Sequence, residues 1–522
     1  DRKWDWRQGE KYPVEKRARL NGLTLSSGSF RFSLSVYDYK ISLSNKIDAV
    51  ALYPITAYDS SKITIDGQEV KSENYSREMA LEPTVKRDVV VKVKDTDGSE
   101  STYLLHITRR KAKFEPSVWD GTVAEDYEGG SGTQDDPYVI INAAQLAYFE
   151  KDINSGTSSN SGSYFCLEND IILNSDYANF ENWGTESPSN VWTPISKYNE
   201  DELEKIFKGS LEGNGHTIYG LYTDGSSGNS GTGLFGALNG GSVSNLNLKK
   251  SYIKADGYAG GVIGVAVGQT GTVEIFNVGF EGIIDTNGVA AGGLVGEIVT
   301  FPTGAIDVYS SYSHGKIFAN DMTGGLIGYV FNDRTIGNSD LTIRIENCYS
   351  GMVIKQNGDA GDYFGGLLGC FSGMDEQISL YMRRSHFAGE INSSADNKGP
   401  ILGGQEDEAG LIEIDNTVYY AKESVAAPIS NQFNAIGFER AKFANGTVFN
   451  LLSNVKRVYN SDLWNWVEGD KYPTAPSHTV ALNDIVLSAG SLTFNPVIAD
   501  YSVWVDKSVK SITLTPYAAN SN

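Results

Sequence analysis

The five histidines are the residues of this chain best suited to act as a general base or to bind a metal ion. They are His106, His216, His314, His386 and His478. A zinc peptidase site needs two histidines one helical turn apart, in the order His-Glu-x-x-His, and no pair here has that spacing. His216 lies in the glycine-rich stretch 213–218, which favours a structural role over a catalytic one. The spacing therefore predicts no histidine metal site.

Carboxylates form two dense groups, Glu406-Asp407-Glu408 and Asn199-Glu200-Asp201-Glu202. A glycosidase needs two carboxyl groups facing each other across a sugar, and a calcium-dependent lyase needs converging carboxylates. Both groups lie in turn-rich stretches, so we interpret them as solvated loops. Asp95 and Asp97 are calcium candidates, but they border Gly98 in a hairpin-turn pattern, which we prefer. No metal ligand set is predicted.

The three cysteines, Cys166, Cys348 and Cys370, contain no Cys-x-x-Cys pair. We expect Cys348 and Cys370 to be small buried thiols on neighbouring coils. The glycine-rich stretch 225–231 lacks the Lys-Ser/Thr of a phosphate-binding loop. Since no Ser/His/Asp motif is visible either, we predict no catalytic residue, no cofactor and no enzyme activity.

Tyrosines remain as candidates for ligand binding, because their rings stack on sugars and their hydroxyls form hydrogen bonds. The candidates are Tyr198, Tyr219, Tyr222, Tyr312, Tyr329, Tyr363, Tyr419 and Tyr420. Long insertions at 186–205, 331–340 and 371–380 are the places where we expect a glycan or a host-surface protein to bind. The pattern does not choose among these residues, so the ligand-binding residues stay unknown here.

Charge and hydropathy exclude two classes of partner. The net charge is −22 and the isoelectric point is near 4.7, whereas binding to nucleic acid needs a basic face. No run of eighteen apolar residues occurs, so no direct membrane insertion is expected. The residues from Asp1 onward have no signal-peptide pattern, and we interpret this start as a cut inside a longer protein.

A short glycine-framed motif indicates the element that must position these residues. It occurs as Gly233-Leu-Phe-Gly236, Gly261-Val-Ile-Gly264, Gly293-Leu-Val-Gly296, Gly325-Leu-Ile-Gly328 and Gly366-Leu-Leu-Gly369, with a weaker copy at Ile401-Leu-Gly403. An apolar pair between glycines that recurs about every 30 residues is typical of a stacked solenoid. Asn277, Asn347 and Asn416 also recur, and we expect an asparagine ladder between rungs.

A second repeat has a period of about 460 residues. The segment Trp4–Pro13 recurs at Trp464–Pro473, and 12 of 38 positions are identical between stretches 20–57 and 482–519. The chain therefore reads as a segment of a tandem array. We expect neighbouring repeat units of the same chain to be its structural partners.

Residues 17–110 predict a β-sandwich, because short alternating strands are separated by turns. The pattern Leu-x-x-Leu-x-Leu-Ser-x-Gly near its start, Tyr39 before a strand, and the closing Thr102-Tyr103 to Thr108-Arg109 resemble the cadherin-like β-sandwich of bacterial surface proteins. The calcium-ligand motifs of true cadherins are not visible.

Residues 130–425 resemble the GLUG-motif parallel β-helix of large bacterial surface proteins, on the glycine motif above and on Ile345-Glu346-Asn347-Cys348-Tyr349 with its partial copies. The resemblance implies a right-handed solenoid. A helix near 142–153 is expected to cap its first coil, with Asn142 and Gln145 as a capping box. Residues 438–452 predict a short helix, and Trp464, Trp466 and Tyr472 an aromatic plug.

The expected all-β chain is a right-handed parallel β-helix preceded by one β-sandwich and followed by part of another. Its expected parts are the tail of a preceding unit at 1–16, a sandwich at 17–110, a linker at 111–129, the β-helix at 130–425, a cap at 426–476 and a second sandwich starting at 477–522. This organisation predicts a non-enzymatic stalk or adhesin on the bacterial cell surface or in the cell wall. The alternatives are a glycan- or host-ligand-binding adhesin domain and a β-helix enzyme that acts on polysaccharides.

Overall fold

The fold comes from a computed structural model of the chain. It describes residues 18–26, 32, 36–43, 47–58, 60–82, 85–109, 116–134, 136–156, 162–225, 230–269, 271–300, 304–332, 342–358, 361–372, 378–406, 410–426, 433–453, 464, 466–467 and 469–474, and the strands at 4–5, 14–15, 482–487 and 514–518. The chain divides into two compact units. The first comprises 1–149, 163–172 and 210–218, and the second the rest. Each is described by itself.

The first unit contains sandwich-like sheets. Its five-stranded sheet has the order β4-β11-β10-β7-β8, and two pairs, β3–β6 and β5–β9, complete it. The strands are β3 (Leu20–Leu25), β4 (Asp38–Leu43), β5 (Ala49–Val50), β6 (Leu52–Thr56), β7 (Lys62–Ile65), β8 (Gln68–Val70), β9 (Met79–Ala80), β10 (Lys86–Lys94) and β11 (Glu100–Arg109). Short strands β1 (Trp4–Asp5) and β2 (Val14–Glu15) also pair.

Alternation of apolar and polar residues produces the sandwich core. On β10, Val89, Val91 and Val93 are fully buried while the residues between them face outward. Tyr103 on β11 is also fully buried, and its hydroxyl accepts a 3.0 Å hydrogen bond from the Leu20 amide of β3. That bond satisfies the one polar atom of the ring inside the core.

The first unit also holds the strands that begin the solenoid. β12 (Tyr138–Ile140), β13 (Tyr164–Leu167) and β15 (Ser210–Glu212) pair in parallel. The capping box of helix α1 (Ala143–Asn154) is confirmed, because the Asn142 side chain accepts from the Gln145 amide at 3.0 Å. The Gln145 side chain accepts in return from the Ile141 amide, and the Phe149 ring stacks on Phe165.

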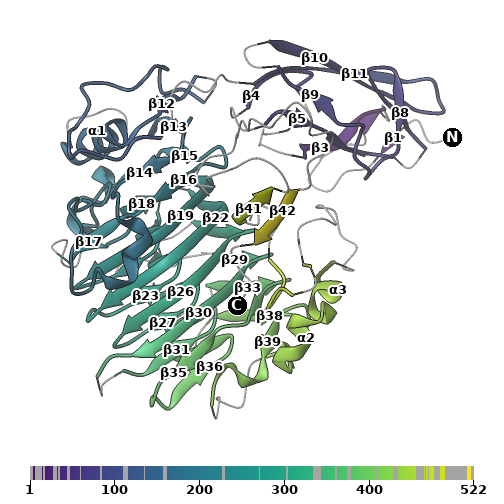
Figure 1. Cartoon of the computed structure of the whole chain (residues 1–522). Helices are drawn as coiled ribbons and strands as arrows, with labels where there is room; N and C mark the ends of the chain where they lie inside the picture. The colour runs from purple at the N-terminus through teal and green to yellow at the C-terminus, as the bar shows by residue number, and fades with distance from the viewer. Residues whose placement is uncertain are drawn as a thin grey trace. The chain divides into compact units, whose positions relative to one another are not determined.

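The second unit is a parallel β-solenoid built from three sheets that the chain visits in turn (Figure 1). One sheet has the order β18-β21-β24-β28-β32-β37, with bounds Phe235–Asn239, Ile263–Gly268, Val295–Thr300, Ile327–Asn332, Leu368–Ser372 and Leu402–Glu406. The second has the order β20-β23-β27-β31-β36, with bounds Ala259–Gly260, Ala291–Gly292, Thr323–Gly324, Tyr363–Gly365 and Asn397–Gly399.

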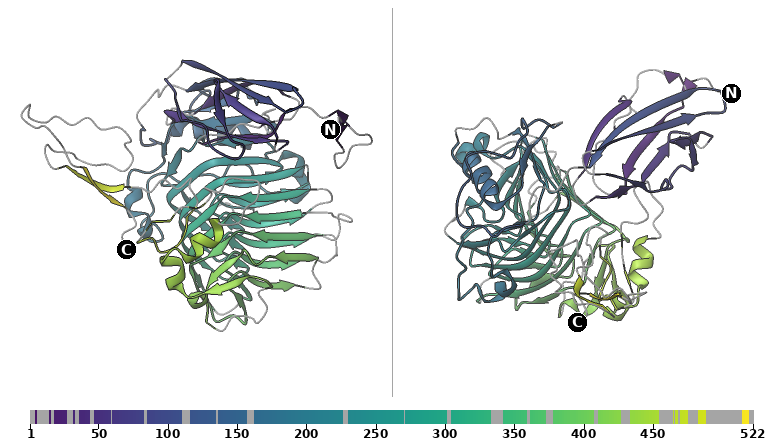
Figure 2. Two further views of the ribbon diagram at one scale, coloured as in Figure 1. Left: turned by 90° about the vertical axis from the view of Figure 1, so that its right-hand side faces the viewer. Right: turned by 45° about the horizontal axis from the view of Figure 1, so that its top comes forward.

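The third and longest sheet carries two strands or strand arms from each coil. Its members in this unit include β17 (Tyr222–Asp224), β19 (Gly241–Ala255), β22 (Thr272–Thr286), β25 (Ala305–Tyr309), β26 (Tyr312–Ala319), β29 (Thr342–Glu346), β30 (Tyr349–Gln356), β33 (Ser379–Arg383), β34 (His386–Phe387), β35 (Glu390–Asn392), β38 (Leu411–Ile414), β39 (Tyr419–Ala421) and β40 (Ile436–Phe438). Figure 2 shows these strands stacked as successive rungs.

The glycine motif forms the tight corner that leads into the β18 sheet. Its first apolar residue points inward, and all six copies, Leu234, Val262, Leu294, Leu326, Leu367 and Ile401, are fully buried. Their backbones hydrogen-bond from rung to rung, as the Leu326 amide does to the Leu367 carbonyl at 2.9 Å. A Cβ on Gly325 would overlap the Gly366 carbonyl of the next rung. Glycine is therefore required by rung spacing.

Asparagine recurs at one position of the coil for a different reason from the expected ladder of side-chain hydrogen bonds. Asn245, Asn277, Ser310, Asn347 and Arg384 occupy one column of the long sheet, and all five have φ between +44° and +56°. Asparagine tolerates this left-handed conformation better than most residues. Asn277 Nδ2 donates to Asn245 Oδ1 at 2.7 Å, so these two side chains do bond between rungs. The expected continuous ladder is wrong, because Ser310 stands between Asn277 and Asn347.

Two short helices follow the last rungs, where the sequence predicted a single helix over 438–452. They are α2 (Arg440–Ala444) and α3 (Thr447–Ser453), separated by Gly446 at φ +76° (Figures 1 and 2). Further along the chain, β41 (Leu482–Leu487) pairs with β42 (Leu514–Ala518), and the other residues of the expected second sandwich lie outside the described part. None of the described helices is long and apolar enough to span a membrane.

Candidate ligand-binding face of the solenoid

A column of stacked rings lies on the long sheet. Tyr312, Tyr349, His386 and Tyr419 are register partners on successive rungs. The Tyr312 and Tyr349 ring centroids are 5.3 Å apart, as are those of Tyr349 and His386, and both pairs are stacked. Such stacking adds to the energy of ring burial. The column turns a repeated sequence position into a continuous aromatic surface.

The segment around Trp464–Tyr472 covers this column. The Trp464 ring lies 5.3 Å from His386, and the Tyr472 ring lies 5.7 Å from Tyr349. His386 Nε2 donates to the Pro473 carbonyl at 2.9 Å. The predicted aromatic plug is thus a strap on the solenoid. Because the strap already occupies the column, Tyr312 and Tyr419 are not available to an external ligand.

A polar triad borders the column. The Glu281 carboxylate accepts from the Tyr312 hydroxyl at 2.8 Å and pairs with Lys249 at 3.0 Å. Burial would raise the pKa of Glu281, but Lys249 and Tyr312 outweigh it and hold the pKa below its usual range. An ionised carboxylate held by two fixed donors is a structural anchor, because it has no proton to give.

The β18 sheet presents a second aromatic surface on its outer side. Here Val265, Glu297, Tyr329, Cys370 and Gly404 are register partners on successive strands. The Tyr329 hydroxyl donates to Glu406 at 3.1 Å. Tyr258, Phe331 and Tyr363 pack around Tyr329 and Cys370, partly buried. The outer side of the sheet is therefore apolar and aromatic rather than charged.

Glu297 is the unusual member of this surface. Its side chain is only 3% exposed, and burial raises its pKa to about 8. It is therefore largely a neutral carboxylic acid at pH 7. A perturbed carboxyl group is a recognised feature of functional sites, but acid–base catalysis needs a second group placed across a substrate. Glu406, the other carboxylate here, instead accepts the Tyr329 hydroxyl.

A cleft of about 600 Å³ lies beside this surface. Its walls are formed by Tyr198 and Tyr258, by charged residues of the 3-10 helix η3 (Glu200–Lys205), and by Lys197 and Ser230, among others. This volume is within the usual range for small-ligand pockets, about 300–1,000 Å³. Tyr198 comes from the predicted insertion 186–205, while Tyr258 was missed because nothing in its local sequence marks it as half-exposed.

The other predicted tyrosines do not join the cleft. Tyr222 and Tyr419 are buried at 2% and 4% exposure, so they are core residues. Tyr219 and Tyr420 are half-buried on the long sheet. Residues 333–340, most of the insertion 331–340, and 373–377, half of the insertion 371–380, lie outside the described part of the chain, as do Asp407 and Glu408.

His216, the cysteines and Asp97 have structural surroundings. His216 is fully buried with Nδ1 3.1 Å from Asp170, which also accepts from the Thr217 amide. The Asp97 carboxylate accepts from the Ser99 amide inside the hairpin, as a turn predicts. Cys348 and Cys370 are buried as expected, but Cys348 lies between β29 and β30 and Cys370 lies on β32 of the same coil, which corrects their predicted placement on neighbouring coils.

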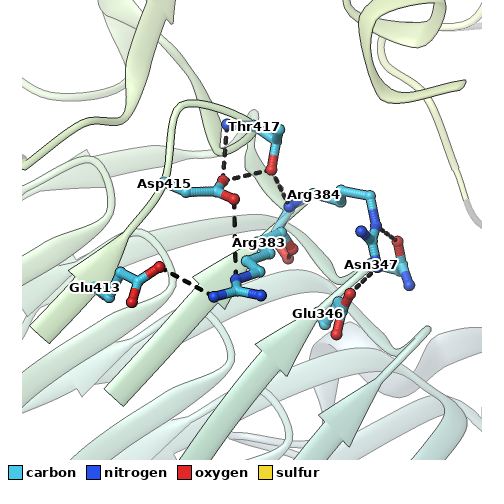
Figure 3. A network of polar contacts seen from close by, with 8 residues as sticks. Glu346, Asn347, Arg383, Arg384, Glu413, Asp415 and Thr417 are labelled. Carbon is cyan, nitrogen blue, oxygen red and sulfur yellow. Dashed lines mark hydrogen bonds and ion pairs between the residues drawn. The ribbon is translucent and has the colours of Figure 1, made fainter. Parts of the chain in front are cut away.

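A charged network crosses the last rungs of the long sheet (Figure 3). Arg383 pairs with Glu413 at 3.0 Å and lies 4.0 Å from Asp415, and Arg384 pairs with Glu346 and donates to Asn347 at 2.9 Å. Opposite charges on adjacent strands add a modest stabilisation to the strand pairing. Among the residues that the structure describes, no group of three or more His, Cys, Asp or Glu could hold a metal ion.

Comparison with known proteins identifies one domain. Residues 20–110 match the family model of the cadherin-like beta sandwich domain. The chain is 29% identical over 251 residues to halomucin of Haloquadratum walsbyi, covering 47% of this chain and 2% of halomucin. It is 33% identical over 156 residues to a "putative Gly-rich membrane protein" of Evansella cellulosilytica, covering 30% of this chain and 16% of that protein.

One solved structure is also similar. A crystal structure described as a "putative immunoglobulin A1 protease" from Bacteroides ovatus aligns with a TM-score of 0.47 and 19% identity. The alignment covers 68% of this chain and 98% of that one. The curated relatives named above are much longer proteins, of which this chain spans a small part.

Proposed function

We propose that this chain is a non-enzymatic segment of a bacterial cell-surface protein, in which the solenoid is a stiff spacer that presents binding regions. The observation that carries the proposal is the filled interior of the solenoid. Six rungs stack the fully buried residues from Leu234 to Ile401 in one column, and from Val262 onward the backbone amide of each donates to the carbonyl of the next. Close packing of this kind resists deformation.

Similarity supports the location. The cadherin-like model matches 20–110, and the relatives carry names that point to a mucin-like protein and a membrane protein. We extend these names to this chain as a proposal of extracellular exposure. The glycine motif further supports a solenoid of the GLUG type. Surface labelling of the producing cells with an antibody against the solenoid would test the location, and labelling only after lysis would contradict it.

The 460-residue repeat supports a tandem role. The strap Trp464–Pro473 covers the aromatic column of its own solenoid, and its copy Trp4–Pro13 precedes the first sandwich. The recurrence of the strap sequence before the sandwich indicates that a unit of the same kind precedes this one in the array. Consecutive units of the array, each with a sandwich and a solenoid, are thus the proposed structural partners.

Single-molecule extension of the full chain tests the spacer role. We expect the solenoid to unfold at high force, and Leu326→Ala to lower that force, because the substitution leaves a cavity in the rung column. Val289→Ala is the matched control, since Val289 is 46% exposed. A solenoid that extends at low force, or whose unfolding force ignores Leu326→Ala, would contradict the proposal.

Activity screens test the non-enzymatic part. Neutral and acidic polysaccharides and protein substrates are incubated with the full chain, and new reducing ends, unsaturated uronates or peptides are measured. We expect none above the buffer blank. Cleavage that is lost in Glu297→Gln or Glu406→Gln would establish the alternative of a β-helix enzyme, because these are the carboxylates of the outer aromatic surface.

A further inference from the structure

One wall of the cleft beside the β18 sheet is the 3-10 helix η3, which packs on the sheet. Leu203 and Ile206 anchor η3 and its following residue on Ala237, Val265 and Val267 of the sheet. The Asn199 side chain caps η3 by accepting from the Asp201 amide at 3.1 Å. These contacts hold the polar residues of η3 in place before any ligand arrives.

The loop that carries Tyr198 is held as firmly. The Asn154 side chain donates to the Pro194 carbonyl at 3.0 Å and accepts from the Ser196 amide at 2.7 Å. Ser196 has φ +63°, and its hydroxyl accepts from the Phe207 amide at 3.0 Å. The Tyr198 amide donates to the Ser230 carbonyl at 2.9 Å. A preformed cleft reduces the entropy that binding would otherwise cost.

The two tyrosines supply ring surface. Tyr198 and Tyr258 are half-buried, packed on one side against the Leu203 cluster and facing the cleft on the other. Burial, with the Glu297 and Glu200 carboxyl groups nearby, raises the pKa of Tyr258 to about 12, so its hydroxyl stays protonated. A half-buried ring with a protonated hydroxyl can stack on a sugar and hydrogen-bond to it.

The charged side chains that line the cleft balance each other, so they favour neither a polyanion nor a polycation. Lys205 and Glu202 pair at 2.5 Å and neutralise each other. Lys197 and Glu200 remain, one charge of each sign. A polyanion would be repelled by Glu200 and by the net negative charge of the protein. A polycation would be repelled by Lys197. A ligand with many hydroxyl groups suits this mixed lining, because each hydroxyl can both donate and accept a hydrogen bond.

We propose that this cleft binds an uncharged saccharide chain, stacked on Tyr198 and Tyr258 and hydrogen-bonded to the polar residues of η3. The inference goes beyond the spacer role, because a spacer needs no ligand. It assigns the surface protein a binding activity of its own, located on the solenoid rather than on a distal domain.

Isothermal titration of the full chain with hexasaccharides tests this inference. The uncharged probes are cellohexaose, laminarihexaose and mannohexaose, the anionic probe is hexagalacturonate, and the cationic probe is the chitosan hexamer. We expect one uncharged hexamer to bind with one site per chain. Tyr258→Ala should weaken it at least tenfold, Glu200→Ala at least threefold, and Tyr258→Phe less than threefold because the ring is kept.

Tyr381→Ala is the matched control, since Tyr381 is a half-buried tyrosine on the long sheet and should not affect affinity. Thermal melting verifies that each variant is folded. If Tyr258→Ala is unfolded, the affinity of Glu200→Ala tests the proposal instead, because the Glu200 side chain is exposed. The proposal is overturned if no uncharged hexamer binds, if only a charged one does, or if the folded cleft variants bind as well as the parent chain. Each result leaves the force measurement of the spacer role unaffected.

Discussion

The Tyr472 hydroxyl lies 2.8 Å from Nδ1 of His314, and Gly351 on the next rung leaves the space in which the two groups meet. A Cβ on Gly351 would overlap that hydroxyl and lie 2.8 Å from His314 Nδ1. The strap therefore fits against the solenoid because Gly351 has no side chain. Gly351 lies 121 residues from Tyr472 in the sequence.

Gly351→Ala should destabilise the solenoid, because the added methyl displaces the Tyr472 ring from the column. We expect a loss of about 1–3 kcal/mol in the free energy of unfolding, measured by urea titration. In a Tyr472→Ala background the same substitution should cost much less, which gives a coupling energy in a double-mutant cycle. Equal costs in both backgrounds would show that the strap does not use this space.

His386 should make stability depend on pH below neutrality. Burial lowers its pKa to about 4 from 6.5, and its Nδ1 has no hydrogen-bond partner in the described part of the chain. Between pH 6.5 and 4 the unfolded chain binds a proton that the folded chain does not, so stability falls as pH falls through this window. The loss amounts to about 3 kcal/mol.

The measurement is the pH profile of unfolding for the parent chain and His386→Phe, which keeps a ring in the column. The variant should lose most of the dependence between pH 6.5 and 4. His106→Phe, in the sandwich of the first unit, serves as the comparison. An unchanged profile in His386→Phe would refute the assignment.

Glu297 should make stability fall as pH rises, which is opposite to the effect of His386. Because its pKa is raised from 4.5 to about 8, the folded chain keeps a proton that the unfolded chain releases between these values. Stability therefore falls as pH rises from 4.5 to 8, by roughly 3–5 kcal/mol. Glu297→Gln should flatten this part of the profile and raise the melting temperature at pH 8, whereas the exposed control Glu204→Gln should do neither.

Ser310→Asn should stabilise the solenoid. Ser310 holds φ +49° in the column of left-handed residues, a conformation that asparagine tolerates better. We expect a gain of about 0.5–1 kcal/mol from reduced strain and from amide contacts with Asn277 and Asn347. Ser242→Asn, at a half-buried strand position outside the column, is the control. A destabilised Ser310→Asn chain would mean that the column does not select for backbone conformation.

The sequence by itself determined the repetitive parts of the fold. The glycine motif predicted the solenoid because stacked rungs repeat one steric requirement, the close approach that Gly325 makes to Gly366, at every turn. Asn142 and Gln145 predicted the start of α1 because a capping box is local. Alternating valines predicted β10 for the same reason, since side chains on a strand point to opposite faces.

Only the tertiary structure decided which residues share a surface. Tyr198, Tyr258 and Glu297 lie on different coils, and the register of the β18 sheet and the packing of η3 bring them to one side. The tertiary structure alone also brings Tyr472 to His314 and places Arg384 in the column of left-handed residues with the asparagines. A sequence pattern encodes burial along one strand, whereas a site depends on rung register and on the segments that cover each face, which are long-range properties of the folded chain.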